Sequence, residues 1–313
     1  MPDLLTHALV GGTVAKAGWG QRLSRPALAA VVAGAVLPDL DTLPAFWDPM
    51  AALKYHRTLT HSLTGGLLIA LPLAWVIWRV GKEKRYWSLA GFAYLGTLLH
   101  IAADLPTAFG VMIFYPWSRD RVAFGWMSSL DPMYTAILVV SWILGWRWRG
   151  RVTRLARVGL LALGLYLAVT LIAQASARTQ LTQALAEGVA ATAKVWAVPR
   201  VGSPLLWYGI VRRPDGIITA NLRLFPPSTV VEMVYPPSWP IPFLDRALAS
   251  EEGRLFSAFA QATVARYWRE GELHVIELED LRFRSNPWGH TAVLRLKMDV
   301  RGDVKDIAFS HRF

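Results

Sequence analysis

The segment LLHIAADL, residues 98–105, decides how this chain is interpreted. It places an imidazole, His100, and a carboxylate, Asp104, inside an apolar run that extends from Tyr86 to Phe114. Four residues apart on a helix, the two side chains project from nearly the same face and can bind one metal ion. The run is long enough to cross a bilayer, where an ionisable residue indicates a functional site. The alternative is a polar pair that holds helices together inside a bundle.

The composition is that of a membrane protein. Of the 313 residues, 54% are hydrophobic and 15 are Trp, whereas an ordinary soluble protein has roughly 45–50% apolar residues. Cys is absent, so a metal ion must be held by His, Asp or Glu. The net charge is +11, but the basic residues cluster beside apolar segments, as at 147–157. The lipid bilayer explains this charge better than nucleic acid does, and we expect no nucleic-acid partner.

Six apolar stretches are the candidate helices of a multi-pass membrane bundle, and the last four are credible spans. The first two are short for a hydrocarbon core of about 30 Å, so they could be tilted, re-entrant or packed inside the bundle. The six stretches are Leu4–Ala17, Ala27–Leu37, Leu63–Val80, Tyr86–Phe114, Met133–Trp146 and Val158–Ala173.

Three basic connections fall at alternate turns of the chain: Lys16–Arg25, Arg79–Arg85 and Arg147–Arg157. Positively charged loops favour the cytoplasm, so all three are expected there. This orientation predicts a protein of the cell (inner) membrane in which everything after Arg178 is extracytoplasmic.

Helix geometry then gives the depth of the polar residues. At about 1.5 Å per residue, His100 and Asp104 lie about 20 and 27 Å from Arg85, and His61 lies about 27 Å from Arg79. The three side chains are therefore expected in one layer near the outer face.

After Arg178 the sequence changes to Pro-rich turns and alternating apolar residues, as in VLRLKMDV at 293–300. This pattern predicts a water-soluble, β-rich (α+β) domain over 178–313, after a helical domain over 1–177. One helix, Leu244–Trp268, is expected to interrupt the strands. The other strand candidates are Leu205–Arg213, Ile217–Phe225, Thr229–Tyr235, His274–Arg284 and Val304–Arg312.

Further polar islands map to the same outer side: Asp3 with His7, then PDLD at 38–41, then YHRTLTHS at 55–62. On an extended turn Asp39 and Asp41 point the same way and could face one site or bridge two ions, although capping of a helix end is an alternative. For His7 the alternative is a position at the level of the headgroups.

His56 and His61 are five residues apart, too far round a helix to share a face. They converge only if His56 lies in a loop and His61 opens the next helix, and the alternative is ordinary interfacial polarity. Asp131 precedes Pro132, which is typical of a helix start.

Together these motifs resemble the YdjM-like (LexA-regulated) family of membrane-bound metal-dependent hydrolases, over about residues 1–132. The resemblance implies a hydrolase with a divalent metal ion, with Zn²⁺ as the expected ion, and it implies no particular substrate. The ordered set that carries it is Asp3-x-x-Thr6-His7-Ala8, Pro38-Asp39-x-Asp41, His56-Arg57-x-x-Thr60-His61-Ser62 and His100-x-x-x-Asp104.

The motifs are also similar to those of zinc-dependent phospholipase C enzymes, in which an Asp, a His and a His-x-x-x-Asp helix hold zinc. That likeness implies a core of ligands and, with His7 and His56, a second ion. Nothing after Asp104 matches the further His and Glu ligands of those enzymes, which argues against a three-metal site. The implied core ligands are Asp39 or Asp41, His61, His100 and Asp104.

The leading hypothesis is an integral membrane hydrolase that uses a metal-activated water on a phosphoester of a lipid or lipid-linked substrate at the outer face. Arg57 would bind substrate charge, and His56 or a spare carboxylate, Asp41 or Asp39, would be the general base. A peptide hydrolase is less favoured because no His-Glu-x-x-His motif is present.

The alternative class is a non-catalytic metal-binding or transport protein, or a scaffold for the outer domain. A transporter needs polar residues that continue to the cytoplasmic face, whereas the inner halves of these helices are almost purely apolar. That absence favours an enzyme. The sequence does not define an oligomeric state.

Overall fold

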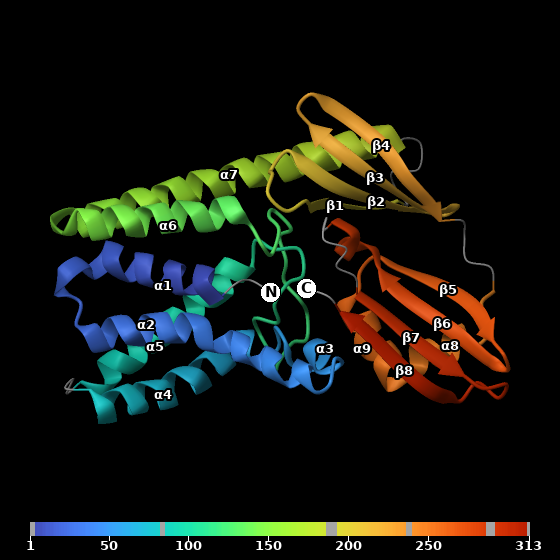
Figure 1. Cartoon of the computed structure of the whole chain (residues 1–313), viewed down its shortest axis with the longest axis horizontal. Helices are drawn as coiled ribbons and strands as arrows, with labels where there is room; N and C mark the ends of the chain where they lie inside the picture. Colours follow the sequence, from blue (N-terminus) through green and yellow to red (C-terminus); the bar gives the residue numbers. More distant parts are fainter. Residues whose placement is uncertain (1–3, 82–84, 186–192, 236–239, 286–291, 312–313) are drawn as a thin grey trace. The chain divides into compact units, whose positions relative to one another are not determined.

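A computed structural model describes residues 4–81, 85–185, 193–235, 240–285 and 292–311 and divides into two compact units (Figure 1). The bundle unit comprises Met1–Pro44 and Tyr55–Leu171, and the sheet unit comprises Ala45–Lys54 and Ile172–Phe313. The predicted fold class, a helical bundle followed by a β-rich part, is confirmed. Residue 178 lies within a single helix, Val152–Leu185, so a domain boundary there stays a prediction.

The bundle unit is helical throughout its described residues apart from its connections. Short 3-10 segments, η1 to η4, join the longer helices, and α3 is a single short turn. From Leu4 to Leu185 the elements are α1 (Leu4–Trp19), η1 (Gly20–Arg22), α2 (Arg25–Val36), η2 (Leu37–Phe46), α3 (Ala51–Tyr55), η3 (Leu59–His61), α4 (Leu63–Val80), α5 (Tyr86–Asp104), α6 (Pro132–Arg147), η4 (Arg149–Arg151) and α7 (Val152–Leu185). Of these, the end of η2 from Ala45, α3 as far as Lys54, and α7 from Ile172 belong to the sheet unit.

Three helical stretches in the described residues are long and apolar enough to cross a membrane: Arg25–Phe46, Leu63–Val80 and Arg149–Leu185. The first includes η2, so the second apolar stretch of the sequence is longer than predicted. The fourth and fifth stretches, which were predicted as spans, are not among these three. Along α4 and α7 large apolar side chains point outward, as typical of lipid-facing helices. They include Leu68, Trp75, Val158, Leu161 and Leu165.

The prediction that the fourth apolar run continues to Phe114 as helix is wrong, because α5 ends at Asp104. The Leu105 amide still donates to the Ile101 carbonyl oxygen, but Pro106 has no amide hydrogen with which to continue the helix. The chain beyond forms a loop held by isolated bridges, one of which joins Val111 to Val122.

Glycines let α2 and α5 pack at close range. A Cβ atom added to Gly96 would lie 2.2 Å from the carbonyl oxygen of Val31, and one on Gly34 would lie 2.2 Å from that of Ala93. By contrast, a Cβ on Gly91 would meet nothing within 4 Å, so that glycine makes no close approach. The core that α2, α4 and α5 form beside this crossing is made of small and aliphatic side chains, namely Ala27, Ala30, Ala70, Ala74, Leu89, Ala90 and Ala93.

The basic helix ends of the bundle unit gather at one end of it (Figure 1). The Arg157 guanidinium donates to the Ala17 carbonyl oxygen at 3.0 Å, and the Lys16 ammonium lies 3.3 Å from the centre of the Trp142 ring. These contacts join α1 to α6 and α7. The shared end agrees with the alternation of basic connections in the sequence.

The sheet unit holds two four-stranded antiparallel sheets, in the orders β1-β2-β3-β4 and β5-β6-β7-β8. The first sheet packs on the end of α7, where Ala177 and Leu181 contact Trp207 and Leu222. Helices α8 and α9 lie between the sheets in the sequence. The elements are β1 (Lys194–Pro199), β2 (Leu206–Arg213), β3 (Gly216–Leu224), β4 (Pro227–Tyr235), α8 (Leu244–Ala249), α9 (Glu251–Phe259), β5 (Thr263–Glu270), β6 (Leu273–Asp280), η5 (Leu281–Ser285), β7 (Ala292–Met298) and β8 (Val304–His311).

The predicted single helix Leu244–Trp268 is wrong. Ser250 ends α8 and caps α9 by accepting a hydrogen bond from the Gly253 amide, so two short helices form. The residues from Thr263 onward form β5, which pairs with β6. Pairing in a sheet overrides the helical pattern that the sequence suggests.

Candidate metal centre

Four segments that are distant in the sequence bring their polar residues together in the bundle unit. His7 comes from α1, Asp39 and Asp41 from η2, His56, Arg57 and His61 from the α3–α4 connection, and His100 and Asp104 from the end of α5. Each of these side chains is at least nine-tenths buried. Asp3, the first residue of the sequence motif, lies outside the described residues.

Four donor atoms surround a common point. The Nε2 atoms of His61 and His100 are 3.0 Å apart. Asp39 Oδ1 lies 3.4 and 3.6 Å from these two nitrogens, and Asp104 Oδ2 lies 3.4 and 3.7 Å from them. A tetrahedral ion with ligand bonds of about 2.0 Å separates its donor atoms by about 3.3 Å. These five distances lie on either side of that value and so fit the coordination of such an ion.

The hydrogen bonds of the two imidazoles point to a cation between them. His100 Nδ1 lies 2.7 Å from the Ala35 carbonyl oxygen, to which it can only donate, so its Nε2 carries a lone pair. His61 Nδ1 lies 3.2 Å from Asp41 Oδ2, so in the neutral imidazole Nδ1 donates and Nε2 also faces inward with a lone pair. Two lone pairs at this range repel one another unless a proton or a metal ion lies between them.

The carboxylate oxygens around this point also lack hydrogen-bond partners. Within the described part of the chain, both oxygens of Asp39 and Oδ2 of Asp104 are buried without a hydrogen-bond partner. Buried carboxylate oxygens are normally satisfied, because an unpaired one costs free energy. A metal ion is the kind of group that satisfies them. All the described groups of three residues that could hold a metal ion come from this one cluster.

The electrostatics favour positive charge at the same point. Burial by itself would lower the pKa of His61, but the adjoining carboxylates of Asp39, Asp41 and Asp104 outweigh it and raise that pKa to about 9. For His56, burial dominates and lowers the pKa, although the hydrogen bond to Asp41 opposes it.

Asp41 lies on the far side of His61 from the four donor atoms. Its oxygens accept from Thr60 Oγ1 and, at 3.3 Å, from the Arg57 amide, and His56 Nδ1 lies 2.8 Å away. A carboxylate in this position fixes the tautomer and the orientation of a metal-binding imidazole. The structure thus places Asp41 to orient His61 and His56 rather than to bind the same ion directly.

Arg57 is enclosed within the site. Its Nη2 donates to Asp104 Oδ1 at 2.7 Å and its Nη1 donates to Thr107 Oγ1 at 2.8 Å, with 3% of the residue exposed. Its backbone φ of 61° is in the left-handed region that non-glycine residues rarely adopt. Its own carbonyl oxygen, which accepts from Met112, helps to hold it there. The side chain therefore neutralises and orients Asp104.

His7 lies beside the four donor atoms. Its ring stacks on that of His100 with centroids 3.9 Å apart, and its Nε2 lies 3.8 Å from both Asp39 Oδ2 and Asp104 Oδ1. Neither ring nitrogen has a hydrogen-bond partner in the described structure. A cavity of about 20 Å³ adjoins it, lined also by Thr107 and Ser129. That volume has room for a water molecule.

Two participants were not predicted. The Ala35 carbonyl oxygen gives no sequence signal, because any residue supplies one. Thr107 follows Asp104 by three residues and donates to the Asp104 carbonyl oxygen at 2.7 Å. The prediction for Asp131 is confirmed: it caps α6, accepting from Met133 and Tyr134 at 3.0 Å each.

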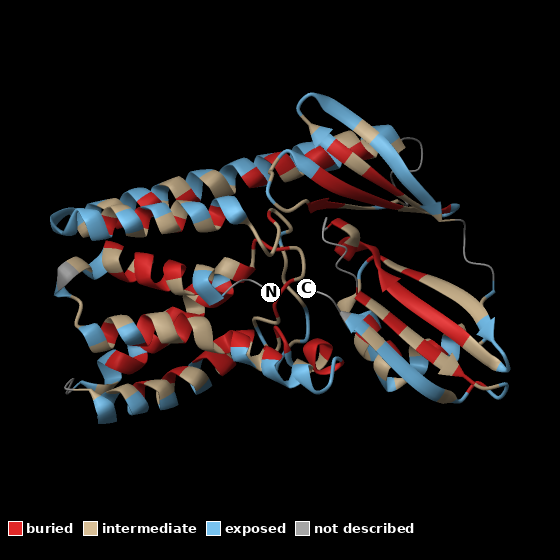
Figure 2. Cartoon of the chain, in the orientation of Figure 1, coloured by how far each residue is buried: buried red, intermediate tan, exposed pale blue. Residues whose placement is uncertain are grey.

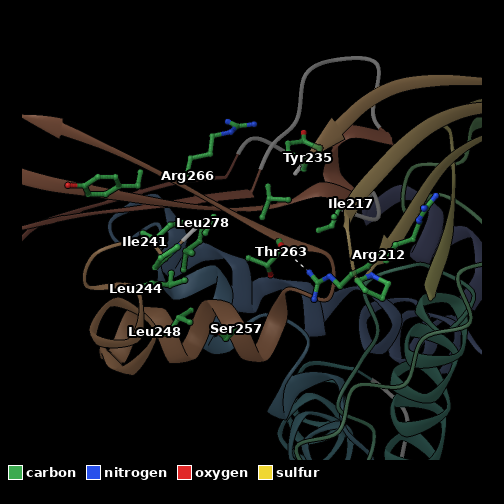
Figure 3. Close-up of a pocket in the computed structure, with 17 residues that line it drawn as sticks. Arg212, Ile217, Tyr235, Ile241, Leu244, Leu248, Ser257, Thr263, Arg266 and Leu278 are labelled. Atoms are coloured by element: carbon green, nitrogen blue, oxygen red, sulfur yellow. Dashed lines mark hydrogen bonds between the residues drawn. The ribbon is translucent and has the colours of Figure 1, made fainter. Parts of the chain in front are cut away.

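The sheet unit has a larger cavity of about 780 Å³ (Figure 3). Its apolar wall includes Ile241, Leu244 and Leu248, and the Arg212 guanidinium donates to the Thr263 carbonyl oxygen at 2.7 Å beside it. No His, Asp or Glu is among the described residues that line it. It is therefore not a second site of the same chemistry.

The fold and the site define a membrane protein whose helical part carries a buried His and Asp cluster suited to a metal ion. The chain matches the family of the YdjM inner membrane protein over residues 1–177 and belongs to that family. Over 137 residues it is 25% identical to "Uncharacterized protein YfhP" of Bacillus subtilis (strain 168), a match that covers 42% of each chain. No solved structure matches it.

Proposed function

We propose that this protein is a metal-dependent hydrolase that cleaves a phosphoester of a lipid or lipid-linked substrate at the outer face of the membrane. The observation that carries the proposal is the set of four donor atoms, from Asp39, His61, His100 and Asp104, spaced as ligands of one tetrahedral ion. Such an ion, Zn²⁺ by the chemistry of these donors, would supply a Lewis acid and would lower the pKa of a bound water toward neutrality.

The depth of the cluster supports a lipid substrate. Aromatic side chains gather at membrane interfaces. In the bundle unit Tyr55, Phe114 and Trp117 are exposed near the cluster in the sequence. The helix ends that carry the basic residues have another exposed set, which includes Trp19, Trp78, Trp87 and Trp146. If the basic ends lie in the cytoplasm, the cluster lies on the outer side of the membrane together with these aromatic residues. It would then be at about the depth of the lipid phosphate groups.

The packing of the bundle unit favours an enzyme over a transporter. On the side of the cluster toward the basic ends, α2, α4 and α5 meet through Ala30, Ala70, Ala74 and Leu89, all at most 4% exposed. An ion that passed through the bundle would need polar groups there to replace its water. The described core offers none at these positions.

Three further residues of the cluster, Arg57, His7 and His56, have the remaining roles in this proposal. Arg57 holds Asp104 in position and balances its charge, since its guanidinium is committed to Asp104 and Thr107. His7 is the candidate general base, because its ring nitrogens are unpartnered and it borders the cavity that can hold a water. His56, with 8% of its surface exposed, is the alternative base or a ligand of a second ion.

The experiment is a hydrolysis assay of the purified full-length protein against a panel of phospholipids, before chelation, after chelation and after addition of Zn²⁺. We expect activity that chelation removes and Zn²⁺ restores, and that is absent in His100→Ala. His274→Ala, a matched change in the sheet unit, should retain it. A protein that binds the metal ion fully but hydrolyses nothing across phosphoester and acyl substrates would contradict the proposal and favour a non-catalytic role.

A further inference from the structure

Two turns at one end of the first sheet expose large apolar side chains. Leu205 and Leu206, at the β1–β2 turn, are 43% and 37% exposed, and Phe225, at the tip of the β3–β4 hairpin, is 77% exposed. We call these three residues the apolar lip. Figure 2 shows the exposure along β4, the strand that leaves this hairpin. Large apolar side chains that are exposed together on a water-soluble domain mark a site of interaction with a protein or a membrane.

The apolar lip lies at the end of the sheet that contacts the earlier part of α7, near Gln180. The opposite end of the sheet contacts the last residue of the helix, Leu185. Leu206 pairs with Arg223, so both turns are at the same end of the strands. The Gln180 amide nitrogen on α7 donates to the carbonyl oxygens of Arg223 and Ser228 at 3.3 and 2.9 Å. At the opposite end of the sheet, Arg213 donates to the Leu185 carbonyl oxygen at 3.4 Å, five residues further along α7.

Because α7 is a candidate membrane span, it gives the height of the lip. Its uncharged apolar stretch begins at Val158, after Arg154 and Arg157, and rises about 21 Å to Ile172. Ile172 is 66% exposed, and Gln174 and Arg178 follow it. The core therefore ends near Ile172, and Gln180 stands about 12 Å beyond it.

The hairpin tip reaches back toward that boundary. Phe225 is two residues beyond Arg223, a distance of about 7 Å along a strand. The tip therefore lies about 5 Å beyond Ile172, and a headgroup layer is about 5–8 Å thick on each side. The two turns that carry the lip, VGSPLL (201–206) and LFPPS (224–228), contain no charged residue. Arg200 directly precedes the first turn, and Arg223 directly precedes the second.

We propose that the apolar lip inserts into the headgroup layer of the leaflet from which α7 emerges. The partner is the lipid surface, and the exposed Arg223 beside the hairpin can reach phosphate while the apolar side chains insert more deeply. The sheet unit is then held at the membrane at two points, α7 and the lip. This inference uses the membrane position of α7 and does not depend on hydrolase activity.

The absence of Cys makes a direct test simple, since each introduced thiol is the only one in the chain. Phe225→Cys and Leu205→Cys would be labelled with bimane in the full-length protein reconstituted in phosphatidylethanolamine and phosphatidylglycerol nanodiscs. Asp215→Cys is the matched control, because it lies 66% exposed at the β2–β3 turn, the opposite end of the same sheet. Lipids that carry a nitroxide quencher near the headgroup report contact with the leaflet.

We expect the quencher lipids to reduce the fluorescence at positions 225 and 205 and to leave position 215 unchanged. Labels at 225 and 205 that are quenched no more than the label at 215, and that respond fully to a water-soluble quencher, would overturn the proposal. Disulfide dimers through position 225 in place of lipid quenching would also overturn it, because they would show that the lip docks on a second copy.

Discussion

Replacement of Gly96 by Ala tests whether the crossing of α2 and α5 holds the metal centre. The new Cβ would lie 2.2 Å from the Val31 carbonyl oxygen and 2.8 Å from the Ala35 amide nitrogen, whereas ordinary contacts begin near 3.4 Å. The two helices must therefore separate by about 1 Å, at a cost of about 1–3 kcal/mol for overpacking. The separation lengthens the 2.7 Å hydrogen bond from His100 Nδ1 to the Ala35 carbonyl oxygen.

Loss of such a supporting hydrogen bond lowers metal affinity by roughly 10- to 100-fold. The assay is zinc titration of the purified protein by calorimetry, with thermal unfolding measured in the same detergent. Gly91→Ala is the control on the same helix, because its Cβ meets nothing within 4 Å. We expect it to keep full affinity and to be slightly stabilised, by about 0.4–1 kcal/mol. Equal zinc affinity in the two variants would refute the role of the crossing.

The other predictions concern the residues around the cluster. Arg57→Ala leaves Asp104 buried without its ion pair, so thermal unfolding of the metal-free protein should show a loss of about 3–5 kcal/mol, whereas Arg57→Lys should lose less. Asp41→Asn should keep the fold but weaken zinc binding roughly 10- to 100-fold in a competition assay with a chelating dye. Unchanged affinity would mean that Asp41 does not orient His61. Asp131→Ala should cost about 0.5–2 kcal/mol in unfolding without changing zinc affinity, because it caps α6.

Most of the cluster could be predicted from the sequence, because His and Asp residues in or beside long apolar stretches are costly unless they have a function. Spacing on one helix placed His100 beside Asp104, and helix depth placed His61 in the same layer. The different orientations of Asp39 and Asp41 could not be predicted, because they follow from the 3-10 backbone of η2, which turns Asp39 to the donor atoms and Asp41 to His56. The enclosure of Arg57 depends on its left-handed backbone, which the sequence does not signal.

In the sheet unit, the sequence predicted strands that correspond to β2, β3, β4, β6, β7 and β8. The period of two is clearest in β7, where buried and half-buried residues alternate. The prediction missed β1, and it missed β5, since TVARYWRE has no clean alternation and closely follows a helix. Its strand conformation comes from pairing with β6, a contact made across a turn and not coded locally.

The most direct test of the central claim is the zinc content of the full-length protein after equilibrium dialysis against Zn²⁺, compared with that of Asp104→Asn and His274→Ala prepared in parallel. The account predicts tightly bound zinc in the wild type and in His274→Ala, and its loss in Asp104→Asn, which removes a charged donor while keeping the shape of the side chain. Zinc retained equally by all three proteins, or bound by none of them, would contradict a metal centre made by Asp39, His61, His100 and Asp104.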